Sequence, residues 1–190
     1  MAKGATYVVQ FRRKREGRTD YKQRLDILKS RGSRLVARKS NARMLTQIID
    51  YSEDGDKVIL CADSNELKKY GWKYSGTSIP ASYLTGYLCA KKALAKGKTK
   101  AIMDIGLQVS VNGSRLYAVL KGAIDGGLEI PANEAVFPDE NRLKGQHIAD
   151  YAQLEAAPKF SGYKKAGADP KDIPAAFEEV KTNISKSLKD

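Results

Sequence analysis

The side chains with the clearest chemical potential are basic and aromatic, and they gather near the start of the chain. Residues 11–28 read FRRKREGRTDYKQRLDIL, with four basic residues directly after Phe11. Arginine has a planar guanidinium group that binds phosphate in a bidentate manner and stacks on bases. Tyr7, Phe11 and Tyr21 lie among these charges, a spacing suited to stacking on unpaired bases. The combination indicates an arm that binds a polyanion.

The positive charge of the chain is concentrated in this region. The 190 residues carry a formal net charge of +12. Residues 1–43 hold 14 Lys and Arg against three Asp and Glu, whereas residues 44–190 hold 20 against 19. A basic arm on a nearly neutral body is typical of a binding device, and its partner is expected to be acidic: nucleic acid, an anionic membrane or an acidic protein. With 42% hydrophobic residues, the body can bury one core.

The basic run has other interpretations. Taken alone, RRKR is also compatible with a solvated charge run or a localisation signal. A membrane-surface helix needs a broad apolar face, and residues 19–31 offer only a narrow stripe. Nine of the eleven arginines lie within residues 1–43, which favours phosphate recognition. We therefore expect the arm to order in a groove of structured RNA, although composition alone does not separate RNA from DNA.

Residues that could support catalysis are sparse. His147 is the single histidine, so no zinc cluster is expected, and we predict that it is a surface or packing residue. Cys61 and Cys89 have no paired spacing and are predicted to be buried free thiols in a reducing compartment. No phosphate-binding loop or dinucleotide fingerprint occurs. We expect no enzyme activity, no cofactor and no metal.

The elements that position the basic residues follow from periodicity and turn signals. Residues 1–18 lack a clean period and are predicted to form an extended arm. A helix is predicted from Thr19, its N-cap, to a stop at Gly32. The Asp54-Gly55 turn favours an antiparallel meander. The three strands of this meander are predicted over residues 33–40, 43–51 and 57–63.

A crossover unit completes the expected body. The predicted elements are helical turns over residues 64–71, a helix over 75–97, a strand over 100–106 and a helix over 114–127. Ser64 is expected to cap the first and Gly71 to end it, and Thr77 or Ser78 is expected to cap the second. The order of strand and helix predicts a parallel pairing. The predicted fold class is α/β: a mixed sheet with a three-strand antiparallel meander and a β-α-β-α crossover, a ribonuclease-H-like motif.

The pattern loosens toward the C-terminus. Residues 172–189 are predicted to be an amphipathic helix capped by Asp172, which packs on the body or on a partner. Its apolar face carries Ile173, Phe177, Val180 and Ile184. Before it we expect a loop over 129–145, a short helix over 146–157 and a linker over 161–170. The predicted domains are residues 1–32 (basic N-terminal arm and helix), 33–128 (central α/β domain) and 129–190 (C-terminal extension).

The ribonuclease-H-like order raises one enzymatic alternative, a metal-dependent nuclease. Such nucleases hold two metal ions with carboxylates on the first and fourth strands. Asp104 lies on the predicted fourth strand, but the first strand offers Arg34, Arg38 and Lys39. These cations would repel Mg²⁺ and attract phosphate. Asp104 is therefore expected to support the fold at the end of its strand.

Five ordered blocks of sequence point to a family. They read FRRKREGRTDYKQRLDILKS, RLVARKSN, GWKYSGTSIPASYLTGYL, AIMDIGL…AVLKGAIDGGL and FPDENRLKGQHIADYA, and the resemblance spans positions 7–152. Together they resemble the archaeal-type large-subunit ribosomal protein that binds 5S rRNA, family number eighteen of the large subunit, whose eukaryotic relative is number five. Bacterial members match mainly the centre of the chain. The long arm and the tail match the archaeal and eukaryotic type.

The resemblance implies a non-catalytic role in the cytoplasm, as part of the large ribosomal subunit. The family attaches 5S rRNA to 23S-type rRNA at the central protuberance. Its neighbours are other large-subunit ribosomal proteins, including other 5S-rRNA binders, and no membrane or small-molecule substrate is implied. The alternative that stays open is a free RNA chaperone or assembly factor for structured RNA.

The arm, the end of the first strand and the loop before the long helix are the expected RNA contacts. The predicted RNA-binding residues are Tyr7, Phe11, Arg12, Arg13, Lys14, Arg15, Arg18, Tyr21, Lys22, Arg24, Arg31, Arg34, Arg38, Lys39, Ser40, Asn41, Trp72, Lys73, Ser75 and Thr77. Core packing is the alternative for Trp72, and a solvated charge is the alternative for Lys73. The loop over 107–114 has no basic residue before Arg115 and is assigned no phosphate contact. The role of the tail from Lys159 stays open.

Overall fold

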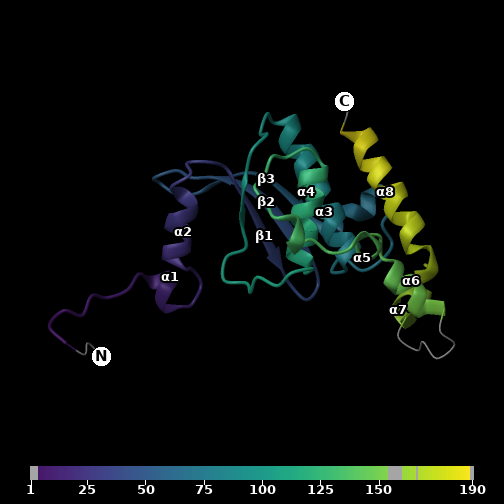
Figure 1. Ribbon diagram of the computed structural model, residues 1–190, viewed down its shortest axis with the longest axis horizontal. Helices are drawn as coiled ribbons and strands as arrows, with labels where there is room; N and C mark the ends of the chain where they lie inside the picture. Colours follow the sequence, from purple (N-terminus) through teal and green to yellow (C-terminus); the bar gives the residue numbers. More distant parts are fainter. Residues whose placement is uncertain (1–3, 154–159, 166, 189–190) are drawn as a thin grey trace.

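The computed structural model describes residues 4–153, 160–165 and 167–188, and it is built around one four-stranded sheet (Figure 1). The strands are β1 (Arg34–Lys39), β2 (Met44–Asp50), β3 (Lys57–Asp63) and β4 (Ile102–Asp104), in the order β3-β2-β1-β4. β2 pairs antiparallel with β1 and β3, and β4 pairs parallel with β1. The predicted meander, parallel pairing and α/β class are confirmed.

The fourth strand is shorter than predicted. It ends at Asp104, whose carboxylate accepts a hydrogen bond of 2.8 Å from the backbone N–H of Gly106. Gly106 has a φ of +62°, a conformation that turns the chain away from the sheet and favours glycine. The strand therefore ends before the predicted residue 106. It also begins two residues later than predicted, at Ile102, and residues 107–114 form the expected loop.

Two helices cover one face of the sheet, as Figure 1 shows. They are α3 (Ile79–Ala95) and α4 (Arg115–Asp125), close to the predicted bounds. The strands present apolar side chains such as Leu35 and Ile48 to this face, and both are fully buried. Removing this apolar surface from water supplies the main stabilisation of the fold.

The two covering helices pack closely because each carries a glycine at the crossing. A Cβ atom on Gly86 of α3 would collide with the carbonyl oxygen of Val119 in α4. A Cβ atom on Gly122 of α4 would collide with the carbonyl oxygen of Tyr83 in α3. The pair of glycines therefore sets the distance between the helices and keeps both of them on the sheet.

The caps of the central helices are partly as predicted. Ser78 caps α3, since its hydroxyl accepts a bond of 3.3 Å from the N–H of Ala81. The 3-10 helix η1 (Ser64–Tyr70) ends at left-handed Gly71 as expected, but its cap is Asp63, not Ser64. The Ser64 hydroxyl instead accepts a hydrogen bond from the backbone N–H of Met44 at the start of β2, so it serves the sheet and not the end of η1.

The N-terminal segment contains more helix than the sequence predicted. α1 (Arg12–Arg15) is a single turn inside the supposedly extended arm. α2 (Tyr21–Leu28) is capped by Asp20, not by Thr19, because the Asp20 carboxylate accepts two backbone N–H groups of the first turn. The Thr19 hydroxyl is occupied by the Arg13 side chain at 2.9 Å. The helix also ends before the predicted stop at Gly32.

The C-terminal region is also more helical than predicted. Its elements are η2 (Glu134–Val136), α5 (Glu140–Lys144), α6 (Gln146–Gln153), α7 (Ser161–Lys165), η4 (Pro170–Asp172) and α8 (Ile173–Ser187). Helix α5 lies in the predicted loop, and α7 lies in the predicted linker, so both of those predictions were wrong. The short helix predicted from 146 is confirmed as α6, while residues 154–157 of that prediction lie outside the described residues.

Helix α8 packs on the body with the face that the sequence predicted. Ile173, Phe177, Val180 and Ile184 are all buried. Polar contacts join the same helix to η1 and α3; one is the bond of 3.0 Å from Asn183 to the carbonyl of residue 70. Asp172 is the cap by position but makes no capping bond through its side chain. Across the described ranges, no helix has the length and apolar character needed to cross a bilayer.

The two cysteines differ, and one prediction was wrong. Cys89 is fully buried in α3, and burial raises the pKa of its thiol to about 12. Cys61 is exposed, because it lies in β3 with its side chain on the face that α3 and α4 leave uncovered. The apolar run KVILC suggested burial, but alternation along the strand turns Cys61 outward.

Replacing Gly86 by alanine should destabilise the fold. The new Cβ atom has no space against Val119, so we expect a loss of about 3 kcal/mol in the free energy of unfolding. Urea denaturation followed by circular dichroism measures it. Gly162→Ala is the matched control, since its Cβ atom would meet nothing within 4 Å. An unfolding free energy unchanged by Gly86→Ala would show that α3 and α4 can separate without cost.

Candidate nucleic-acid interface

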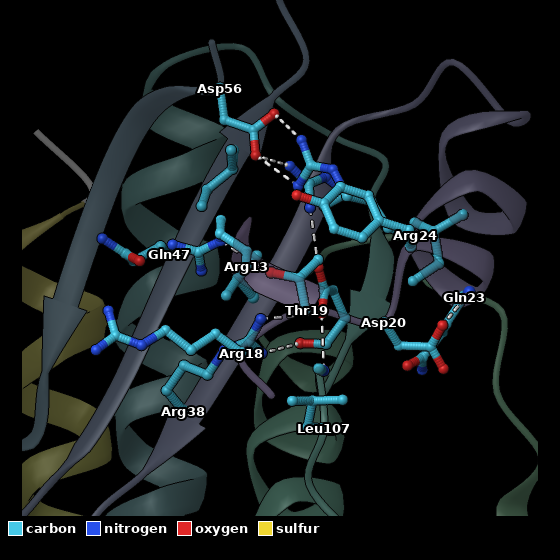
Figure 2. Close-up of a pocket in the computed structure, with 17 residues that line it drawn as sticks. Arg13, Arg18, Thr19, Asp20, Gln23, Arg24, Arg38, Gln47, Asp56 and Leu107 are labelled. Atoms are coloured by element: carbon cyan, nitrogen blue, oxygen red, sulfur yellow. Dashed lines mark hydrogen bonds and ion pairs between the residues drawn. The ribbon is translucent and has the colours of Figure 1, made fainter. Parts of the chain in front are cut away.

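The N-terminal segment lies over the second face of the sheet, and a cavity of about 560 Å³ lies between them (Figure 2). Its walls come from the arm, α2, β1, β2 and the end of β4. Five arginines line it: Arg13 and Arg18 from the arm, Arg24 from α2, and Arg34 and Arg38 from β1. The fold thus brings together basic residues that the sequence predicted as separate contacts.

A chain of ion pairs forms the floor of this cavity. Arg24 donates to both carboxylate oxygens of Asp56, at 2.8 and 2.9 Å. Arg34 joins the same Asp56, at 2.6 Å, to Asp104, at 2.9 Å. Arg38 donates to Asp104 at 3.1 Å. The chain connects α2, the β2–β3 turn, β1 and β4, so the basic residues here hold elements together.

The ion pair between Arg24 and Asp56 keeps both groups charged. Burial raises the pKa of Asp56, but the hydrogen bonds from Arg24 and Arg34 outweigh that effect and hold the pKa below its usual range. The hydrogen bond to Asp56 raises the pKa of Arg24, against the opposing effect of burial. Both groups are therefore ionised at neutral pH.

Arg34 is not available to RNA, which corrects its prediction as a contact. Its side chain is only 3% exposed and is held between Asp56 and Asp104. Asp104 supports the fold as predicted, bound by Arg34 and Arg38. Two guanidinium groups therefore stand where a nuclease would place metal ions. Among the described residues, no three His, Cys, Asp or Glu side chains lie close enough to hold a metal.

The arm itself is open to solvent. Tyr7 is 50% exposed and Phe11 is 69% exposed. The Phe11 ring packs on Tyr21 with their centroids 5.0 Å apart, which ties the arm to α2. The arginines of α1 are exposed, and the exposed ion pairs that Arg12 and Arg18 make with Glu16 add little stability. These side chains remain free to meet a phosphate backbone.

A second group of predicted contacts meets at the end of the sheet. The turn after β1 exposes Ser40 and Asn41, and it lies beside the loop before α3, since a Cβ atom on Gly76 would come within 3.8 Å of the carbonyl of residue 42. Lys73 in that loop is exposed. Trp72 is 2% exposed and belongs to the core, so its prediction as an RNA contact is corrected.

Exposure divides the predicted residues into three sets. The exposed ones are Tyr7, Phe11, Arg12, Arg13, Lys14, Arg15, Arg18, Lys22, Arg31, Lys39, Ser40, Asn41 and Lys73. The half-buried ones are Tyr21, Arg24, Arg38, Ser75 and Thr77. Only Arg34 and Trp72 are buried. Ser75 and Thr77 bond to each other at 2.9 Å just before α3, so much of their hydrogen-bonding capacity serves the turn.

Sequence reasoning missed several residues of the cavity, among them Asp56, Gln47 and Leu107. Asp56 was treated as part of a turn, and Gln47 and Leu107 were assigned no role. Asp56 meets Arg24 across 32 positions of sequence, and no local pattern signals such a pair. Alternation along β2 does place Gln47 on the face opposite the core, and this was the one available signal.

The fold and this surface define a class: an α/β protein whose basic arm and sheet face suit a polyanionic partner. A family model described as "Ribosomal large subunit proteins 60S L5, and 50S L18" matches residues 5–102 and 95–133. The chain belongs to this family. It is a structural, non-enzymatic constituent of the large ribosomal subunit, with rRNA and other ribosomal proteins as its partners.

Similar proteins come from several archaea and carry the name "Large ribosomal subunit protein uL18". That of Korarchaeum cryptofilum is 50% identical, covering 97% of both chains. That of Methanobrevibacter smithii is 49% identical, covering 98% of this chain and 99% of its own. That of Thermofilum pendens is 47% identical, covering 99% and 100%. The resemblance to the archaeal type is confirmed over nearly the whole length, including the arm and the tail.

Replacing Arg24 by alanine should release α2 from the sheet without unfolding the body. The bidentate pair with Asp56 is lost, so amide hydrogen exchange in residues 21–28 should become about tenfold faster. Exchange in β2 should stay unchanged. Lys22→Ala is the control, because Lys22 lies on the same helix with an exposed side chain. Equal exchange in both variants would show that the ion pair does not hold α2.

The same contact should respond to pH in one direction. The pKa of Asp56 in the folded protein lies below its unfolded value of about 3.9. Its stabilising effect is therefore complete above that value and is lost as the pH falls through the folded pKa. Exchange in α2 of the wild type, corrected for the intrinsic pH dependence, should stay constant from neutral pH down to about 5 and rise only below about 4. A rise near pH 6 would contradict this assignment.

Proposed function

We propose that the chain binds 5S rRNA and anchors it to 23S-type rRNA at the central protuberance, beside other 5S-rRNA-binding proteins. The observation that carries the proposal is the exposed arm. Its arginines and aromatic rings gather beside one face of the sheet, while the opposite face is closed by α3 and α4. Membership of the family supports a ribosomal RNA as the polyanion.

The arm would supply most of the binding free energy. Each arginine that neutralises a phosphate releases condensed counterions, so affinity depends steeply on salt. Tyr7 and Phe11 are exposed far enough to stack on unpaired bases. Because α1 is one short turn with no buried residue, the arm can adjust to the shape of an RNA groove.

The end of the sheet would add shape recognition. Lys39 ends β1, and Ser40 and Asn41 lie on the tight turn after it, where the Ser40 hydroxyl accepts backbone N–H groups at 3.0 and 3.3 Å. Lys73 lies on the adjacent loop. A rigid turn positions its side chains better than the arm does, so we assign it the preference for 5S rRNA over other RNAs. In the proposed division into arm (1–32), central domain (33–128) and extension (129–190), the arm supplies affinity and the central domain supplies shape recognition.

The test is competition between 5S rRNA and tRNA for the purified full chain across a salt series. We expect a preference for 5S rRNA that survives rising salt, because shape recognition does not depend on counterion release. Equal affinity for the two RNAs, lost together as salt rises, would refute specific 5S binding. It would favour a general RNA chaperone instead.

Deleting residues 1–18 should weaken 5S rRNA binding and flatten its salt dependence. Each lost phosphate contact should lower the slope of log affinity against log salt by about one unit. Filter binding or fluorescence anisotropy measures the slope. The control replaces Lys171, Lys181 and Lys186 by alanine, which removes charge at the other end of the molecule. A slope unchanged by the deletion would show that the arm does not touch phosphate.

A further inference from the structure

The cavity between the arm and the sheet has properties that surface contact with RNA does not require. Its volume of about 560 Å³ is in the range of small-molecule sites. One side is closed by β1 and β2, and the other is covered by the arm and α2 (Figure 2). A cavity of this kind can surround a ligand group and remove it from water.

The charge on the cavity wall is unbalanced. Five arginines line it against three carboxylates, an excess of two positive charges. Asp20 is engaged by backbone N–H groups of α2, and Asp56 and Asp104 are engaged by the three arginines of the ion-pair chain. Arg13 and Arg18 carry the excess. Arg18 lies 3.4 Å from Glu16, an exposed pair that does not hold it firmly.

A buried donor in the same wall lacks a partner. The Nε–H of Arg34 makes no hydrogen bond with any residue that the structure describes, although the side chain is 97% buried. A buried unsatisfied donor costs about 1–3 kcal/mol, and native structures rarely leave one unexplained. The other two nitrogens of this guanidinium group hold Asp56 and Asp104. Because this nitrogen is itself buried, a ligand in the cavity does not reach it, and it is the excess charge of Arg13 and Arg18 that favours an anionic ligand.

We propose that this cavity binds a phosphate monoester. A monoester carries close to two negative charges at neutral pH, which matches the excess on the wall, whereas a backbone diester carries one. A monoester also ends its chain, so it can enter a cavity that is closed on one side. A diester has a ribose on each side and would have to enter as a loop. Arg13 and Arg18 hold the phosphate, and Gln47 lies beside it on β2.

Two sources carry this chemistry: the terminal phosphate of an RNA chain, and a free nucleotide. The RNA source rests on the proposed function. The experiment titrates the full-length protein, by calorimetry, with a short single-stranded RNA carrying either a 5′-phosphate or a 5′-hydroxyl group. AMP and adenosine serve as the free probes. We expect the 5′-phosphorylated RNA to bind about tenfold more tightly than its hydroxyl counterpart.

Neighbouring arginines provide a matched pair of variants. Arg12 and Arg13 lie in the same turn of α1 and are both exposed, but only Arg13 lines the cavity. Arg13→Ala should remove most of the preference for the 5′-phosphate, whereas Arg12→Ala should keep the preference and weaken the binding of both RNAs equally. Gln47→Glu is a second test, since it places a carboxylate in the cavity without removing any of the five arginines. Circular dichroism confirms that each variant is folded.

The outcomes separate the sources. A preference for the phosphorylated RNA without binding of AMP supports an RNA terminus. Binding of AMP but not adenosine, lost in Arg13→Ala, supports a free nucleotide. Equal affinity for the two RNAs together with no binding of AMP overturns the proposal. An equal loss of the preference for the 5′-phosphate in Arg12→Ala and Arg13→Ala overturns it as well. If 5S rRNA still binds in that case, the proposed function stands; if it does not bind, both fail.

Discussion

The buried guanidinium group of Arg34 is the constraint on which the arrangement of arm and body depends. A charge removed from water must be paired, because leaving it alone costs several kcal/mol. Arg34 meets this need with Asp56 from the β2–β3 turn and Asp104 from β4. Asp56 in turn holds Arg24, and through it α2. One charge on the central strand β1 thereby fixes a turn, an edge strand and a helix.

This constraint gives the two faces of the sheet different mechanical properties. The face under α3 and α4 is held by apolar burial and by close approach at Gly86 and Gly122, so it opens only when the protein unfolds. The face under α2 is held mainly by ion pairs, and α2 has no fully buried residue. The exposed pairs of the arm, in which Arg12 and Arg18 face Glu16, can be exchanged for contacts with phosphate at little net cost. The arm can therefore reorganise on RNA while the body remains intact.

The sequence predicted the elements whose signals are local. The period-two strands, the caps and stops of α3, and the apolar face of α8 all depend on residues within a few positions of each other. The site depended on contacts between distant residues, and these were missed: Arg34 lies 70 positions from Asp104. A cation on the outer face of a strand has the same local pattern whether it meets water or a buried carboxylate. Arg34 was therefore predicted to be an RNA contact. Trp72 was also predicted to be an RNA contact, because its position in a loop does not reveal that its side chain is buried.

The same distinction explains which of the many arginines can serve function. The arginines of α2 and β1 that line the cavity, Arg24, Arg34 and Arg38, each hold a carboxylate of the body. Those of the arm face at most the exposed Glu16. Both groups contribute equally to the net charge, but only the arginines of the arm can neutralise phosphate without leaving a buried carboxylate unpaired. The arginines that pair with carboxylates of the body thus maintain the fold. They also hold the arm, with its exposed arginines, where an RNA can reach it.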